Sequence, residues 1–143
     1  MAINKKYSKS RIGYETMDDR EVLKIVHSVR EGVPYYGFHS IIENTPFTLA
    51  EWSEYLHVSE RTLQRYKKEK KRFDVMQSER IVQIVQLYYY GIDVFGSNEK
   101  FDSWLSGESV ALGNIIPKSL LDSSFGISLL KDELGRIEHG ILA

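Results

Sequence analysis

Apolar residues recur three and four positions apart along most of this 143-residue chain, and only Pro34, Pro46 and Pro117 interrupt the pattern. This spacing puts apolar side chains on one face of a helix, whereas a half-buried strand would alternate apolar and polar positions. A chain of this length makes about one domain, or two small lobes, and buries a core without disulfides. The sequence therefore predicts an all-α fold.

The pattern divides the chain into three parts. Residues 1–17 carry several basic side chains and few large apolar ones, which predicts a flexible tail. Residues 18–96 are predicted to form a helical domain that contains a helix-turn-helix. Residues 97–143 are predicted to form a smaller helical domain with a net charge of −3, from four basic and seven acidic residues after position 98.

Residues typical of a helix start mark where most of the predicted helices begin. These starts are Asp18, Thr48, Ser59, Ser78, Asn98, Pro117 and Ser123. Thr48 with Glu51 fits a capping box. The last helix, over residues 123–139, contains Gly126 and Gly135, and glycine inside a helix costs about 0.8–1 kcal/mol relative to alanine. We therefore expect another backbone to approach closely at both glycines.

The helix predicted after Ser78 is apolar on more than one face. Ile81, Ile84 and Val85 belong to its main stripe, and Val82 with Tyr89 forms a second one. Such a helix is either the central helix of the core or part of a dimer surface. We expect the core position and keep Val82 and Tyr89 as candidate homodimer contacts.

Two short helices are predicted to meet between His57 and Ser59, across about three residues, as in a helix-turn-helix. Leu63 and Tyr66 supply the inward face of the second helix, so its other side chains point outward. Between residues 61 and 72 seven basic residues stand against one acidic residue, although the whole chain has net charge −1. The alternative is a helical hairpin with a solvated charged face.

A recognition helix needs side chains that read base edges and others that neutralise phosphates. Arginine forks suit guanine, the glutamine amide suits adenine, and lysines contact phosphate without reading sequence. The residues predicted to bind DNA are Arg61, Gln64, Arg65, Lys67, Lys68, Lys70 and Lys71.

Several function classes lack the residues they need. The chain has no Cys, and its four His lie far apart in sequence without a metal-ligand motif. It has no phosphate-binding glycine loop and no nucleophile elbow. We expect no metal, no cofactor and no catalysis, with a helical enzyme of unfamiliar type as an alternative. No signal peptide or membrane span is recognisable, so we expect a cytoplasmic protein.

Residues 35–143 resemble the antitoxins of RES-Xre toxin–antitoxin modules, the Xre/MbcA/ParS family. The resemblance rests on Ala111-Leu112-Gly113, Pro117, Leu120-Leu121, Gly126, Leu134 and Gly135-Arg136-Ile137-Glu138-His139-Gly140. In the turn Leu56-His57-Val58-Ser59, His57 replaces the usual glycine, and a left-handed backbone costs more for His than for Gly. Ser123 replaces a threonine that is common in the family.

The resemblance implies a homodimeric antitoxin that is not itself an enzyme. Its Xre-like part would bind operator DNA, and its C-terminal part would cover the active site of a RES-domain toxin that consumes NAD. Arg136 offers a fork suited to a carboxylate or to the place of an NAD phosphate. The candidate toxin-binding residues are Arg136, Glu138, His139, Gly140, Ile141, Leu142 and Ala143. A plain transcription regulator without a toxin partner is the alternative.

Overall fold

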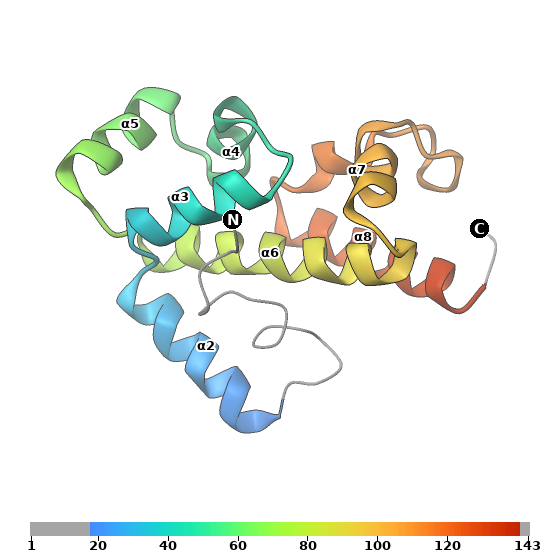
Figure 1. The fold of residues 1–143 in the computed structure, drawn as a ribbon, viewed down its shortest axis with the longest axis horizontal. Helices are drawn as coiled ribbons and strands as arrows, with labels where there is room; N and C mark the ends of the chain where they lie inside the picture. Colours follow the sequence, from blue (N-terminus) through green and yellow to red (C-terminus); the bar gives the residue numbers. More distant parts are fainter. Residues whose placement is uncertain (1–17, 141–143) are drawn as a thin grey trace. The chain divides into compact units, whose positions relative to one another are not determined.

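The computed structural model describes residues 18–140, and every named element in this range is a helix (Figure 1). The predicted all-α fold is therefore confirmed. The elements are α2 (Asp19–Glu31), α3 (Tyr35–Asn44), α4 (Leu49–Leu56), α5 (Glu60–Glu69), α6 (Val75–Phe95), α7 (Asn98–Ser106), the 3₁₀ helices η2 (Val110–Leu112) and η3 (Pro117–Leu120), and α8 (Ser124–Glu138). The tail predicted over residues 1–17 lies outside the described residues.

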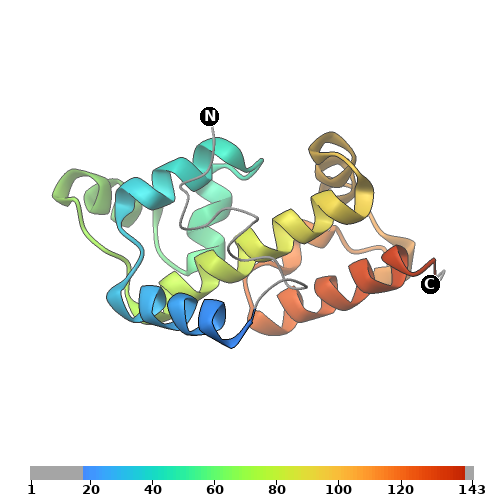
Figure 2. The same cartoon turned by 60° about the horizontal axis from the view of Figure 1, so that its bottom comes forward.

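The chain divides into two compact units, Met1–Gln86 and Leu87–Ala143, and this division falls inside α6. The first unit holds α2 to α5 and the first half of α6. The second unit holds the rest of α6, then α7, η2, η3 and α8. Figure 2 shows α8 in red along its length. The domain boundary that the sequence predicts between residues 96 and 97 stays a prediction.

Most of the predicted helix starts are confirmed. The Thr48 hydroxyl accepts a hydrogen bond from the Glu51 amide (3.1 Å), and the Thr48 amide donates to the Glu51 carboxylate (3.0 Å), which completes the capping box. The side chains of Asp18, Ser59 and Ser123 cap α2, α5 and α8 by accepting a hydrogen bond from the amide three residues further on. Pro117 opens η3, where its missing amide costs nothing.

Two predicted starts are wrong. Helix α6 begins at Val75, and Asp74 caps it by accepting from the Gln77 amide (2.7 Å). Ser78 is instead fully buried, and its hydroxyl accepts from the Val33 amide (2.9 Å). Helix α7 is capped by Ser97, not Asn98. Ser97 and Asn98 are adjacent and both are able to cap, whereas Asp74 lies four residues before Ser78, so α6 begins one turn earlier than predicted.

Aromatic side chains fill the core of the first unit. Phe38 on α3 packs edge-on against Trp52 on α4 (ring centroids 5.2 Å apart) and against Phe73 (4.9 Å). Leu63 on α5 is fully buried, and α5 packs against both α3 and α4. Side chains of this size buried together contribute several kcal/mol, at about 1.5–3 kcal/mol each. The core therefore fixes the orientation of α5 relative to α3 and α4.

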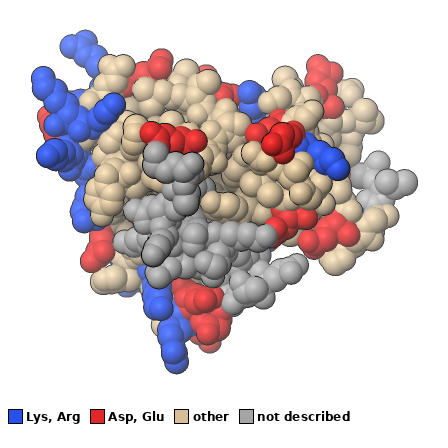
Figure 3. All heavy atoms as spheres, viewed as in Figure 1, with Lys and Arg blue, Asp and Glu red and all other residues tan. Residues whose placement is uncertain are grey.

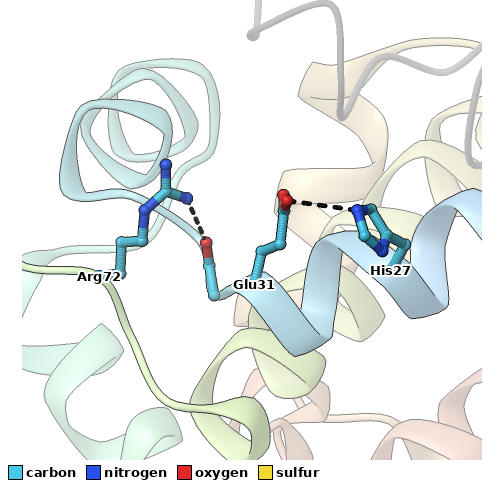
Figure 4. A network of polar contacts seen from close by, with 4 residues as sticks. His27, Glu31 and Arg72 are labelled. Atoms are coloured by element: carbon cyan, nitrogen blue, oxygen red, sulfur yellow. Dashed lines mark hydrogen bonds and ion pairs between the residues drawn. The ribbon is translucent and has the colours of Figure 1, made fainter.

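The segment after α5 is hydrogen-bonded to the segment after α2. The Phe73 amide donates to the Val33 carbonyl (2.9 Å), and the Arg72 guanidinium donates to the Gly32 carbonyl (2.9 Å). Figure 4 shows this contact of Arg72, and also the pair of His27 with Glu31 on α2. Arg72 belongs to the basic stretch of the sequence, but it holds the fold here.

The second unit is built on close helix contacts. A side chain on Gly91 of α6 would overlap the ring of Phe101 on α7, so glycine is required there. On α8, a side chain on Gly126 would overlap the carbonyl of Leu120, which confirms the close approach predicted at that position. The same expectation is wrong at Gly135, whose surroundings hold only the Tyr90 hydroxyl, 3.6 Å from an added Cβ.

The core position expected for α6 is confirmed by its buried residues. Ile81, Val82, Ile84, Val85, Leu87 and Tyr88 are all buried. Val82 is therefore a core residue and is not available as a homodimer contact. Tyr89 is half-buried, and burial raises the pKa of its phenol.

Candidate functional site

Helices α4 and α5 form the predicted helix-turn-helix, joined by His57, Val58 and Ser59. His57 takes the left-handed conformation (φ 57°, ψ 41°) that glycine usually supplies at such a turn. Its amide donates to the Glu54 carbonyl (3.2 Å), and the Val58 amide donates to the Ser53 carbonyl (3.1 Å). The turn thus satisfies the carbonyls of Ser53 and Glu54 in the last turn of α4, in spite of the histidine.

Helix α5 turns Leu63 and Tyr66 inward and its charged residues outward. Leu63 is fully buried and Tyr66 is half-buried. All the residues predicted to bind DNA are exposed: Arg61, Gln64, Arg65, Lys67, Lys68, Lys70 and Lys71. Figure 3 shows Lys and Arg gathered at the upper left, where Figure 1 places α5. The structure therefore presents these side chains on a single basic surface.

The ring of Tyr66 orders part of this surface. The Arg65 guanidinium lies 5.8 Å and the Lys71 ammonium 5.2 Å from its centroid, both within cation–π distance. Tyr66 itself packs edge-on against Phe73 (5.3 Å). Lys70 ends α5 in the left-handed conformation, and the Lys71 amide then donates to the Tyr66 carbonyl (2.9 Å). The lysines after α5 thus follow a backbone of defined geometry.

The second candidate surface lies at the C-terminal end of α8. Arg136 donates from Nε (3.1 Å) and pairs through Nη2 (3.0 Å) with Glu133, a carboxylate that is only 3% exposed. Tyr90 donates to the Glu138 carboxylate (3.2 Å), and His139 is exposed beside it. Gly140 follows with φ 71°. Ile141, Leu142 and Ala143 lie outside the described residues.

Sequence reasoning missed an exposed apolar side chain on α8. Phe125 is 91% exposed and Leu129 is 43% exposed, one turn further along the helix. A signal was present, because Phe125 stands off the stripe of Ile127, Leu130 and Leu134 that the periodicity assigns to the core. Large apolar side chains outside that stripe are candidates for contact with another molecule.

Two family models match successive parts of the chain. A family model described as an antitoxin Xre-like helix-turn-helix domain matches residues 24–86. A second, described as an antitoxin Xre/MbcA/ParS C-terminal toxin-binding domain, matches residues 91–140. A protein of Yersinia enterocolitica named Antitoxin Xre is 30% identical over 120 residues, which cover 83% of this chain and 81% of the relative. The chain belongs to the Xre antitoxin family.

A second relative agrees. An Antitoxin Xre of Photorhabdus laumondii is 33% identical over 75 residues, or 52% of this chain and 51% of the relative. In this Xre-family chain the helix-turn-helix match contains α4 and α5, and the C-terminal match contains α7 and α8.

Within residues 18–140, no group of three or more His, Asp or Glu side chains is placed to hold a metal ion. None of the helices in that range has the length and apolar character needed to cross a bilayer.

Proposed function

We propose that this chain is the antitoxin of a two-protein module in the cytoplasm. Its C-terminal unit binds a RES-domain toxin and covers the active site where that toxin consumes NAD. Its helix-turn-helix binds operator DNA as a homodimer and so regulates the module, without catalysis of its own. The observation that carries the proposal is the match of residues 91–140 to a toxin-binding domain beside a helix-turn-helix of the same family.

Exposed cations on a positioned helix support the proposal for DNA. Arg61, Gln64 and Arg65 are exposed, and their arginine forks and glutamine amide are the groups that suit guanine and adenine, while the exposed lysines suit phosphates. A homodimer matches two half-sites about one helical turn apart. Of the two residues predicted as homodimer contacts, Val82 is buried, and we propose the half-buried Tyr89.

Exposure at the end of α8 supports the proposal for the toxin. Glu138, His139 and Gly140 are exposed on the last turn of the described chain, and Arg136 is half-exposed beside them. We propose that these residues, with Ile141, Leu142 and Ala143, cap the NAD cleft of the toxin. A variant that ends at Gly140 tests the last three residues while it leaves every described contact of α8 in place.

Two binding measurements on the intact chain test the proposal. The wild type should co-purify with the toxin encoded beside it and should bind its own promoter DNA with a steep salt dependence. The double variant Arg61→Ala, Arg65→Ala should lose the promoter and keep the toxin. The matched control Arg20→Ala, Lys24→Ala removes two exposed cations from α2 and should keep both. Promoter binding without toxin binding would favour the plain regulator.

A further inference from the structure

The outward face of α8 is a continuous stripe rather than a scatter of surface residues. Its members are spaced by four, three, four and three positions, which keeps them on one side of a helix. They are Phe125, Leu129, Asp132, Arg136 and His139. At 1.5 Å per residue the stripe is about 21 Å long. The opposite side carries Ile127, Leu130 and Leu134, all buried.

The start of this stripe is held rigidly although its side chains are exposed. The Gly126 amide donates to the Ser123 hydroxyl (3.0 Å), and Gly126 packs on the Leu120 carbonyl. Phe125 therefore stands on a fixed backbone, with 91% of its surface in water. Because the backbone is already ordered, binding through this aromatic side chain costs little further conformational entropy, which is a property of binding hot spots.

The stripe also has a defined chemical order. Phe125 and Leu129 give it an apolar start, and Asp132 adds an exposed carboxylate. The positive charge of Arg136 is engaged by Glu133, and the exposed Lys131 stands next to Asp132, so the charges around the middle of the stripe balance. A partner that fits it has an apolar groove followed by a polar surface without a strong charge of either sign. The far end carries Arg136 and His139, which belong to the toxin surface proposed above.

We propose that the toxin docks along this whole face of α8, with Phe125 and Leu129 seated in an apolar groove of the toxin. Phe125 is the anchor, and the residues at the end of α8 are the distal part of the same interface. This inference rests on the proposed function, and it adds a contact surface that begins three turns before Arg136, the first of the residues proposed to cap the toxin. The stripe is continuous with those residues, and for this reason we assign it to the toxin rather than to a second copy.

The test measures binding of the toxin encoded beside the gene to the intact chain. Phe125→Asp should weaken binding by at least about thirty-fold, the size expected of a hot-spot residue. Leu129→Asp should also weaken it, and Phe125→Trp should retain it. Met76→Asp is the matched control, because Met76 is 82% exposed in the first turn of α6, in the other unit. Thermal unfolding of each variant shows that it is folded, and Phe125→Ala replaces Phe125→Asp if the charge disturbs the helix.

The possible results separate this inference from the proposed function. If the wild type binds the toxin and Phe125→Asp and Phe125→Ala bind within about threefold of it, the toxin uses another surface and this inference alone is wrong. If the wild type does not bind the toxin, the proposed function fails, and the inference fails with it. If Phe125→Asp abolishes a homodimer and leaves toxin binding intact, the stripe belongs to a second copy, which also overturns the inference.

Discussion

Glu133 and Arg136 lie one turn apart on α8 and share two contacts, from Nε (3.1 Å) and Nη2 (3.0 Å) of the guanidinium to one carboxylate oxygen. Glu133 is 3% exposed, whereas the Arg136 side chain is 41% exposed. A buried carboxylate is costly unless it is paired and hydrogen-bonded. Arg136 therefore has a structural role first, and it is not the unengaged fork that the sequence analysis offered to a partner.

We predict that Arg136→Ala lowers the free energy of unfolding by about 1–3 kcal/mol, because it leaves Glu133 buried without its cation. Glu133→Gln in the same chain should recover part of this loss, since a neutral amide costs less to bury. Urea unfolding of the two single variants and the double variant gives the coupling energy. If the losses of the two single variants add up to that of the double variant, the interaction between Glu133 and Arg136 contributes nothing to the free energy of unfolding. Toxin binding by Arg136→Ala has to be measured under conditions where that variant is folded.

The two glycines of α8 should respond in opposite directions to alanine. Gly126→Ala should destabilise the chain by several kcal/mol or shift η3, because the added Cβ would overlap the Leu120 carbonyl. Gly135→Ala should stabilise it by about 0.5–1 kcal/mol, because alanine favours a helix and its Cβ would lie at an ordinary contact distance, 3.6 Å, from the Tyr90 hydroxyl. Thermal unfolding compares them. Equal effects would contradict the packing described at Leu120.

The left-handed turn residue of the helix-turn-helix gives a third prediction. His57→Val should lower the free energy of unfolding by about 1–2 kcal/mol, because a β-branched residue is strained at φ 57°. His57→Gly should be at least as stable as the wild type and should keep promoter binding. Chemical unfolding with a DNA titration checks both. A valine variant as stable as the wild type would mean that the turn has another conformation in solution.

Alkaline pH should destabilise the second unit through Tyr88. Burial, and then its hydrogen bond to Asp102 (2.8 Å), raise the pKa of this phenol well above 10.0. Below about pH 10 the phenol is neutral in both states, so its contribution to stability is complete. Above that pH the unfolded chain ionises and the folded one does not, so stability falls.

The variant Tyr88→Phe separates this contribution from others. At pH 7 it should lose about 0.5–1.5 kcal/mol with the hydrogen bond. Its stability should then fall less steeply than that of the wild type between pH 10 and 11. The pKa values of Tyr35 and Tyr89 are also raised by burial, so some alkaline slope should remain. Parallel slopes for the two proteins would contradict the assignment to Tyr88.

Features set by neighbours in sequence were predictable, and those set by distant neighbours were not. The capping box of Thr48 and Glu51 joins residues three apart, so the pattern shows it directly. Ser78 looks like a cap in the sequence, but its partner is the amide of Val33, 45 residues away. The two glycines of α8 are alike in sequence, and only the packing of Leu120 against Gly126 distinguishes them.

The candidate sites show the same limit. The outward residues of α5 follow from the inward Leu63 by helical periodicity alone. The contact of Arg136 with Glu133 has a spacing that the sequence shows, but the burial of Glu133, which gives the contact its meaning, is a tertiary property. Phe125 could have been found, because it departs from the core stripe of its helix.

The most direct test of the account is cellular NAD during co-expression with the toxin encoded beside the gene. We predict that the wild type holds NAD at the level of toxin-free cells. The double variant Arg61→Ala, Arg65→Ala should protect NAD equally well when it is expressed from a heterologous promoter. Phe125→Asp should protect poorly at the same protein level. If NAD falls as far with the wild type present as without it, the chain does not neutralise this toxin and the central claim is wrong.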